Sequence, residues 1–356
     1  MGRAAETGAE PDLVAKVALL QDARSYSEPT GRIEAIETHM SWVFLGERLV
    51  YKLKKPVRYD FLDFSSLAAR AHYCAEEVRL NAPLAPGVYL GAVPLARAPD
   101  GRIRVDGRGE PVDWLVKMRR LPADRMLDAL LARGAVPADA LRAVARRLAD
   151  FYRALRPAAT DGAQYRRRLE ARLRDNLEVL VDPDLGLAAD RVRRIHRRMQ
   201  ALLEQLPRPF EQRAATGRVV EGHGDLRPEH VCLESPPLIF DRLEFNRELR
   251  IVDALEEVAG LAMECERLGG AAAGATLLRE YLVESGDDPP PAVTQFYMAH
   301  RAGVRARLAI LHLRELAPPA WPRWQRVANA YLELAERYAL TLPVQFCPSS
   351  TSEPPV

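Results

Sequence analysis

The chain has 356 residues, more than a single hydrophobic core usually organises, so we expect two lobes. Its hydrophobic content of 48% and charged content of 28% are ordinary for a globular protein. A net charge of +2 argues against a dedicated binder of nucleic acid or another polyanion. The sequence shows neither a long apolar run nor a cleavable leader, which predicts a cytoplasmic protein without a membrane partner.

Strand-like runs alternate with turn residues through the first third of the chain. They cover 33–38, 41–45, 49–53, 91–98, 103–105 and 112–118. A helix is expected from about Ser65 to Asn81, with Ser65 or Ser66 as its N-cap. We therefore predict a five- or six-stranded antiparallel sheet that ends near Arg119, preceded by a polar and disordered segment over residues 1–10.

From Ala123 onward the apolar spacing becomes 3.6 residues, which is typical of amphipathic helices. Helices are expected over 165–180, 192–206, 271–284, 293–316 and 321–340. The predicted fold class is α+β, with a sheet-based lobe over 1–118, a helical lobe over 119–342 and a flexible tail over 343–356. The arginine runs on these helices indicate solvated faces, because no aromatic residues are interleaved to stack on bases.

Two rare residue types are distributed in different ways. The four cysteines are scattered without a C-x-x-C pair, which predicts reduced and packed thiols. Lysine occurs five times against 46 arginines, and three of the lysines are Lys52, Lys54 and Lys55, with a fourth at Lys117. This concentration indicates a local requirement for lysine.

The segment His223-Gly-Asp-Leu-Arg-Pro-Glu-His230 carries the strongest chemical signal. Asp225 follows His-Gly, and His230 lies five positions later, the same offset as in the kinase catalytic loop H-R-D-x-x-x-x-N. Two short apolar runs around a Ser-Pro-Pro turn then place Asp241 at a strand end. Asp225 is thus the candidate acceptor of a hydroxyl proton, and Asp241 the candidate ligand of a magnesium ion on nucleotide phosphates.

This segment resembles the aminoglycoside phosphotransferase family of the protein-kinase-like superfamily, whose usual form is H-G-D-x-x-x-x-N followed by a metal-binding Asp. The longer form H-G-D-L-R-P-E-H, with F-D-R-L-E-F-N after it, is similar to a bacterial subgroup of aminoglycoside phosphotransferase-like proteins. The resemblance spans about Ile33 to Leu316. It implies a two-lobed kinase-like fold and the transfer of phosphate from ATP, with Mg²⁺, to a hydroxyl of a small molecule.

Some members of that subgroup carry a P-loop ATPase domain after the kinase-like domain. This chain has no G-x-x-x-x-G-K-[ST], so we expect that domain to be absent, and a separate P-loop ATPase is a candidate partner. A second departure is His230, where the family usually has Asn. Because an imidazole nitrogen is a poorer magnesium ligand than an amide oxygen, His230 is either a metal ligand or a hydrogen-bonding group, and Glu229 is an alternative ligand.

Candidate nucleotide contacts come from the N-terminal lobe. Leu49-Val-Tyr-Lys52 resembles the kinase V-A-I-K strand, whose lysine meets the α- and β-phosphates. Lys54 lies on the same strand face and competes with it. Glu77, or Glu76 beside it, is the candidate partner of that lysine, as the glutamate of the kinase αC helix is.

Two weaker candidates complete the nucleotide site. The break at His39-Met-Ser41 sits where a kinase places its phosphate-covering loop but lacks glycines, so Ser41 and backbone N–H groups would approach the phosphates. Met118 occupies the hinge position, where it would stack against adenine. A plain interdomain linker is the alternative reading of that position.

The predicted helix after the motif carries several acids, which are Asp253, Glu256, Glu257, Glu264 and Glu266. Such acids can hold a polyamine substrate, but we favour a charged outer face. The favoured function is a phosphotransferase with an alcohol group as acceptor, and the alternative is a non-catalytic nucleotide-binding scaffold of the pseudokinase type. An RNA-associated protein that uses the arginine-rich helices is a third hypothesis.

Overall fold

The computed structural model describes residues 11–26, 28 and 30–345. The predicted disorder of residues 1–10, the position of Cys347 and most of the predicted tail therefore lie outside the described residues. The chain folds into two compact units. The first contains the residues up to Ala129 together with Glu229–Leu249, and the second contains Leu130–Pro228 together with the residues from Arg250 onward.

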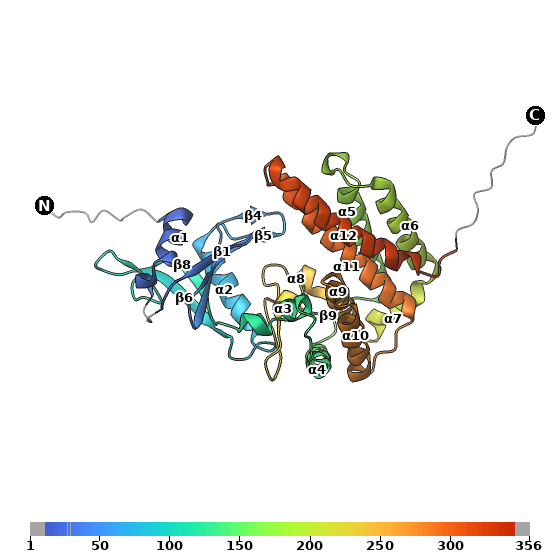
Figure 1. The fold of residues 1–356 in the computed structure, drawn as a ribbon, viewed down its shortest axis with the longest axis horizontal. Helices are drawn as coiled ribbons and strands as arrows, with labels where there is room; N and C mark the ends of the chain where they lie inside the picture. Colours follow the sequence, from blue (N-terminus) through green and yellow to red (C-terminus); the bar gives the residue numbers. More distant parts are fainter. Residues whose placement is uncertain (1–10, 27, 29, 346–356) are drawn as a thin grey trace, which may run out of the picture. The chain divides into compact units, whose positions relative to one another are not determined.

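The first unit is built on an antiparallel six-stranded sheet with the order β1-β2-β3-β8-β6-β7. Figure 1 labels β1, β6 and β8 of this sheet, with α2 (Leu67–Asn81) beside them. The strands are β1 (Glu34–Glu37), β2 (Ser41–Leu45), β3 (Leu49–Lys54), β6 (Tyr89–Arg97), β7 (Ile103–Val105) and β8 (Glu110–Arg119). A small hairpin, β4 (Arg58–Tyr59) with β5 (Leu62–Asp63), follows β3. The predicted α+β class and the N-terminal antiparallel sheet are confirmed.

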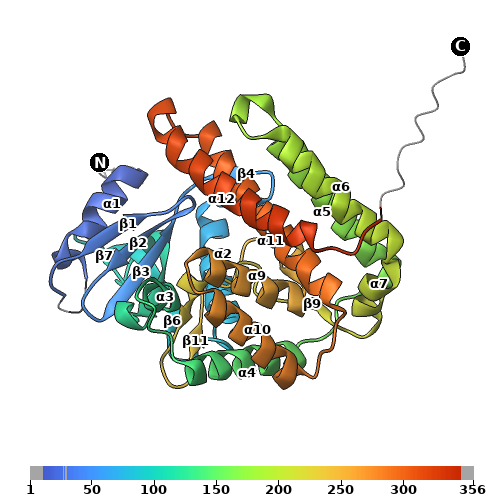
Figure 2. The same cartoon turned by 45° about the vertical axis from the view of Figure 1, so that its right-hand side comes forward.

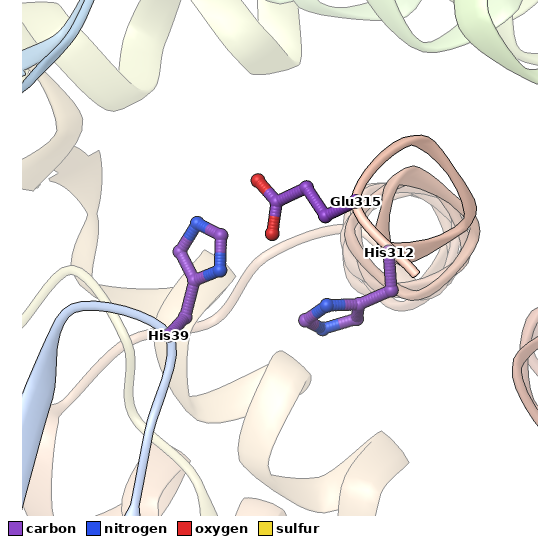
Figure 3. Close-up of side chains that lie close together, drawn as sticks. All are labelled: His39, His312 and Glu315. Carbon is purple, nitrogen blue, oxygen red and sulfur yellow. The ribbon is translucent and has the colours of Figure 1, made fainter. Parts of the chain in front are cut away.

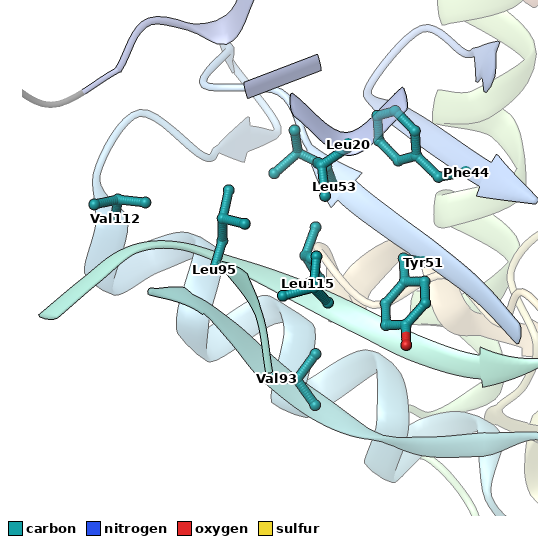
Figure 4. Close-up of a cluster of buried hydrophobic side chains, with 9 residues drawn as sticks. Leu20, Phe44, Tyr51, Leu53, Val93, Leu95, Val112 and Leu115 are labelled. Carbon is teal, nitrogen blue, oxygen red and sulfur yellow. The ribbon is translucent and has the colours of Figure 1, made fainter. Parts of the chain in front are cut away.

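One face of this sheet packs into an apolar core shown in Figure 4. The core contains Leu20 of α1 (Leu13–Gln21) and, from the strands, Phe44, Tyr51, Leu53, Val93, Leu95, Val105, Val112 and Leu115. Because side chains alternate along a strand, burying Tyr51 and Leu53 in this core turns Lys52 and Lys54 to the opposite face. The core thus determines the direction of the two lysines.

The opposite face carries α2 (Leu67–Asn81), which matches the predicted helix. Ser66 is its N-cap, with its hydroxyl accepting a hydrogen bond from the amide of Ala69 at 3.1 Å. Cys74, Glu77 and Asn81 fall on the buried side of the helix at intervals of three and four residues. Glu77 is therefore placed on the side of α2 that meets the sheet.

The segment Glu229–Leu249 belongs to the first unit although its neighbours in sequence belong to the second. It contains the antiparallel pair β10 (Val231–Cys232) and β11 (Leu238–Ile239), which matches the predicted short strands. Cys232 and Leu238 pack against Ala85 and Val88, between α2 and β6. This packing places Asp241, two residues after β11, beside the sheet.

The second unit is mainly helical (Figure 2). Its longer helices are α4 (Ala138–Ala154), α5 (Gly162–Leu180), α6 (Ala189–Gln205), α7 (Pro207–Ala215), α9 (Ala254–Arg267), α10 (Ala271–Ser285), α11 (Pro291–Leu311) and α12 (Trp321–Leu340). The sequence did not predict α7, nor the antiparallel pair β9 (Val219–Glu221) and β12 (Ile251–Asp253). Helices α11 and α12 lie side by side.

Helix α11 ends earlier than predicted, and a 3₁₀ turn follows it over His312–Arg314. Figure 3 shows His312 and Glu315, which project from this stretch of chain. The amide of Glu315 donates to the carbonyl of His312 at 3.2 Å, and the ring of His312 lies 3.9 Å from that of Trp324, between centroids.

Across the described part of the chain, no helix has both the length and the apolar character that crossing a membrane requires.

Candidate active site

The His223-Gly-Asp segment of the second unit is held by Glu257, a fully buried residue of α9. Its carboxylate accepts hydrogen bonds from the amide of His223 at 2.7 Å, from the amide of Gly224 and from the hydroxyl of Tyr152 at 2.8 Å. Burial raises the pKa of Glu257, while the donated hydrogen bonds oppose that rise. A Cβ at Gly222 would lie 2.3 Å from the same carboxylate, so this approach requires glycine there.

Asp225 follows directly and is surrounded by donors of the second unit. Nη1 of Arg305 on α11 lies 3.5 Å from its Oδ1, and Nη1 of Arg227 lies 4.0 Å from its Oδ2. Its amide donates to Nδ1 of His223 at 3.3 Å. The Asp225 side chain is 30% exposed, so its carboxylate is oriented and still open to solvent.

Arg305 is itself fixed by α9 and α12. Its Nε lies 3.2 Å from Glu264, and the hydroxyl of Tyr331 donates to the same carboxylate at 2.8 Å. Burial acts to lower the pKa of Arg305, but the charges of Asp225, Tyr331 and Glu264 outweigh it and raise that pKa. Arg305 is therefore a permanent cation beside Asp225. Nothing in the sequence pointed to this residue, which lies 80 positions beyond the motif.

The favoured interpretation of the α9 acids as a charged outer face is wrong. Asp253, Glu256, Glu257 and Glu264 are all buried, and Glu266 alone is partly exposed. Each has partners from other elements of the second unit: Arg213 contacts Asp253 at 2.6 Å, and His300 contacts Glu256 at 3.1 Å. These acids hold the helices together, because buried carboxylates are stable only when paired and hydrogen-bonded.

Lys52 lies between two carboxylates in the first unit. Its Nζ is 2.9 Å from Oε1 of Glu77 and 2.7 Å from Oδ1 of Asp241. Burial acts to lower the pKa of Lys52, but the charges of Asp241 and Glu77 outweigh it and hold that pKa well above its usual range. Glu76, the alternative to Glu77, instead pairs with Arg79 one turn along α2, at 2.6 Å.

Lys54 also contacts Glu77, with its Nζ 2.6 Å from Oε2, and it forms a second ion pair with Glu244. Its side chain is fully buried, whereas that of Lys52 is 15% exposed. Lys52, and not Lys54, is therefore the lysine that meets Asp241. Glu244 stands within the motif F-D-R-L-E-F, three residues after Asp241, so a signal for it was present in the sequence.

Asp241 adopts a left-handed backbone conformation with φ of 60°, which aspartate tolerates better than most residues. Its amide donates to the hydroxyl of Tyr89 at 3.0 Å, and the next amide, that of Arg242, donates to Oδ1 of Asn81 at 2.8 Å. Burial, with the charges of Glu77 and Asp241, raises the pKa of Tyr89, so its hydroxyl stays neutral. Sequence reasoning did not identify Tyr89 or Asn81.

His230 approaches the same carboxylate, with its Nε2 3.4 Å from Oδ2 of Asp241. This arrangement favours the hydrogen-bonding interpretation of His230, since carboxylate ligands of metals are commonly hydrogen-bonded in turn. Glu229, the alternative ligand, lies half-buried in the 3₁₀ turn Pro228–His230. Asp241 is 37% exposed and offers hard carboxylate oxygens, so the residues present suit Mg²⁺.

Ser41 and Met118 are both placed in the first unit. Ser41 is buried, and its amide donates to the hydroxyl of Thr38 at 3.0 Å, which does not favour a phosphate contact. Met118 packs on the apolar cluster around Val88 and Leu238, and Phe240 joins that cluster. The structure thus brings Lys52, Glu77, Asp241 and His230 together in one unit, and Asp225 stands in the other.

The chain has relatives among mycobacterial proteins. No family profile matches the chain. Uncharacterized proteins of Mycobacterium tuberculosis (strain ATCC 25618 / H37Rv) and Mycobacterium bovis (strain ATCC BAA-935 / AF2122/97) are each 35% identical to it over 291 residues. The match covers 81% of this chain and 57% of each relative, so the chain spans little more than half the length of these proteins.

Two solved structures resemble the chain over most of its length. A mutant of aminoglycoside 2'-phosphotransferase-IIIa in complex with GDP has a TM-score of 0.51 at 15% identity, over 88% of this chain and 94% of that one. Choline kinase from Cryptosporidium parvum Iowa II has a TM-score of 0.54 at 10% identity, over 91% and 94%. The chain therefore has the protein-kinase-like fold of aminoglycoside phosphotransferases and choline kinases.

Proposed function

We propose that the protein transfers the γ-phosphate of ATP, with Mg²⁺, to a hydroxyl of a small molecule. The observation that carries this proposal is the position of Lys52 between Glu77 and Asp241. A lysine held by a helix glutamate on one side, and facing a metal-binding aspartate on the other, is the arrangement that phosphoryl transfer requires of the nucleotide site. The complex of the phosphotransferase neighbour with GDP supports a nucleotide as ligand.

Each group of the first unit then has a role. An ammonium carries three donors, and the contacts of Lys52 with Glu77 and Asp241 account for two of them, so a phosphate oxygen can take the third. Asp241 would hold Mg²⁺, with His230 orienting its second oxygen. When bound, the ion supplies charge neutralisation on the phosphate oxygens. Tyr89 and Asn81 fix the backbone of Asp241 and Arg242, which sets where the carboxylate points.

Asp225 is the proposed acceptor of the proton from the attacking hydroxyl. Arg305 and Arg227 orient its carboxylate, and Glu257 fixes the two amides just before it. A base works only when its oxygen lies at hydrogen-bond distance from the hydroxyl, so this scaffold matters more than the basicity of one carboxylate. The reaction then proceeds mainly through positioning and electrostatic stabilisation.

The acceptor in this proposal is a small molecule that carries a hydroxyl group. The buried acids of α9 are paired with residues such as Arg213 and His300, so they do not supply a binding site for a polyamine. The names of the structural neighbours support a small hydroxylated acceptor, such as an amino alcohol or an amino sugar. A separate P-loop ATPase as partner stays a prediction.

Calorimetric titration of magnesium–ATP, and of magnesium–GTP, into the wild-type protein and into Asp241→Asn tests the nucleotide site. We expect the wild-type protein to bind one of them and Asp241→Asn to bind at least about 10-fold more weakly, since metal ligands and their neighbours have effects of this size. Asp100→Asn, a change of an exposed acid on a turn of the same unit, is the matched control and should bind normally. Absence of binding by a folded wild-type protein would contradict the proposal.

A non-catalytic nucleotide-binding module is the second candidate. It is favoured by the buried position of Ser41 at the turn where glycines would cover the phosphates. Screening small alcohols and amino sugars for phosphate incorporation, with Asp225→Asn as control, separates the two. Product formation that disappears in Asp225→Asn supports the enzyme, whereas equal nucleotide binding by both proteins without turnover on any acceptor supports the module.

A further inference from the structure

Two lysines share one glutamate in the first unit. Lys52 and Lys54 stand two residues apart on β3, about 7 Å between Cα atoms, and point to the same face. Nζ of Lys52 donates a hydrogen bond to Oε1 of Glu77 at 2.9 Å, and Nζ of Lys54 donates one to Oε2 at 2.6 Å. Each oxygen of this carboxylate is therefore held by its own lysine.

The same two lysines also reach one short stretch of the Glu229–Leu249 segment. Lys52 contacts Asp241, and Lys54 contacts Glu244 three residues later. The two lysines of β3 are joined on one side through Glu77 of α2, which both contact. They are joined on the other side through the stretch 241–244, which each contacts at one end, so the contacts form a closed ring. We call these five residues, Lys52, Lys54, Glu77, Asp241 and Glu244, the lysine ring.

Exposure to solvent rises across the lysine ring, from Lys54 and Glu77 at its buried end to Asp241 at its open end. Lys54 and Glu77 are fully buried and Glu244 is 7% exposed, whereas Lys52 is 15% and Asp241 is 37% exposed. Two ammonium groups face three carboxylates, and the acid open to solvent is Asp241. The buried half of the ring thus serves as a rigid base, and the surplus negative charge lies where a divalent cation can reach it.

We propose that Lys54 and Glu244 are positioning residues of the nucleotide site. They touch neither the nucleotide nor the metal. Lys54 locks the carboxylate of Glu77, which directs Lys52, and its ion pair with Glu244 anchors the stretch that carries Asp241. The separation of the Lys52 ammonium from the Asp241 carboxylate is thereby set before the nucleotide arrives. This inference rests on the proposed function, since it assigns the support of that same site.

Lysine is the residue that this role requires. The Lys54 ammonium is fully buried between Glu77 and Glu244 and lies 5.0 Å above the ring of Phe64. A compact charge with donors in several directions fits such a position better than the planar fork of arginine. In a chain that uses 46 arginines and five lysines, both lysines of the ring fit this requirement.

The test compares two buried lysines of the first unit. Lys54→Met removes a member of the ring, and Lys16→Met removes another buried lysine, 6% exposed, whose Nζ lies 2.8 Å from Asp113, outside the ring. Asp113 keeps its contact with Arg70 at 2.7 Å in that control. The affinity for magnesium–ATP and its dependence on Mg²⁺ concentration are measured by calorimetry, and thermal unfolding is measured alongside.

We expect Lys54→Met to weaken the magnesium–ATP affinity about 10–100-fold, as the loss of residues that support metal ligands does. Lys16→Met should lose comparable thermal stability and keep its affinity within about 3-fold of the wild type. Because Lys54→Met leaves Glu244 as a buried acid without this lysine, the double variant Lys54→Met/Glu244→Met is the second arm. It should regain thermal stability without regaining affinity.

The outcomes separate this inference from the proposed function. If the wild-type protein binds neither magnesium–ATP nor magnesium–GTP, the proposed function fails and the inference falls with it. If the wild-type protein binds, and the folded Lys54→Met or double variant binds equally well, the inference alone is overturned. Equal losses of affinity in Lys54→Met and Lys16→Met would also overturn it, since stability would then account for the effect.

Discussion

The buried carboxylate of Glu256 should make the protein sensitive to acid in a calculable way. Its Oε1 lies 3.1 Å from Nδ1 of His300, and its Oε2 lies 3.5 Å from Arg172. Burial opposes ionisation, but the hydrogen bond with His300 and the charges of Arg172, His300 and Arg301 lower the pKa of Glu256 to about 2, against 4.5 for a free glutamate. A depressed pKa means that the folded state prefers the ionised form.

The ionised Glu256 carboxylate therefore stabilises the folded state fully above pH 4.5, where Glu256 is also ionised in the unfolded chain. This stabilisation is lost as the pH falls through the folded-state pKa of about 2. A difference of about 2.5 pKa units corresponds to at most roughly 3 kcal/mol at neutral pH, where burial lowers the pKa of His300 and its neutral ring contributes a hydrogen bond but no charge. Glu256→Gln removes this titration, so it should lower the free energy of unfolding by up to that amount at pH 7 and by a smaller amount near pH 3, where part of the stabilisation is already lost.

Urea unfolding of the wild-type protein and of Glu256→Gln between pH 3 and 7 measures the effect. Glu333→Gln, a change of a 67%-exposed acid of the same unit, is the control and should follow the wild-type profile within about 0.5 kcal/mol. A stability deficit of Glu256→Gln that stays constant over this pH range would refute the reasoning, because it would show that Glu256 acts by packing and not by its charge.

Three further substitutions address the proposed site. Lys52→Met should reduce phosphotransfer about 10²–10³-fold, since it removes a charge aimed at the phosphates, and normal turnover by the variant would contradict its role. Tyr89→Phe removes the acceptor of the Asp241 amide, so calorimetry should show weaker magnesium–ATP binding together with a loss of about 0.5–1.5 kcal/mol in stability, and unchanged affinity would count against it. Glu257→Gln presents one acceptor oxygen where the carboxylate presents two, so thermal unfolding should show a loss of about 1–3 kcal/mol and enzyme assays a lower turnover. Tyr152→Phe, which removes only one donor to Glu257, is its control and should keep most of the turnover.

The parts of the site that could be predicted are those whose signal is local in the sequence. The strand spacing around Lys52 and the cap at Ser66 fix which residues face the sheet, so the contact of Lys52 with Glu77 followed from two short segments. The position of Asp241 followed from two short apolar runs and the turn between them. Local patterns of this kind need no knowledge of the rest of the chain.

The parts that could not be predicted depend on partners far along the chain. The acids of α9 look like a solvated face until Arg213 and His300 are seen to pack against them, 40 and 44 residues away. Arg305 is one of 46 arginines, and its sequence context does not distinguish it from the others. Burial of a charge is a property of the assembled helices, so a single sequence carries no direct record of it.

The division of the first unit between two stretches of chain has a consequence for biosynthesis. After Ala129 has left the ribosome, 120 further residues must be synthesised before Leu249 emerges. This takes roughly 6–24 seconds at usual rates of synthesis. During that interval the nascent sheet lacks Cys232 and Leu238 against Val88, and the buried Lys54 lacks Glu244. The first unit therefore cannot finish folding until Leu249 has emerged, although its six-stranded sheet is complete in sequence at Arg119.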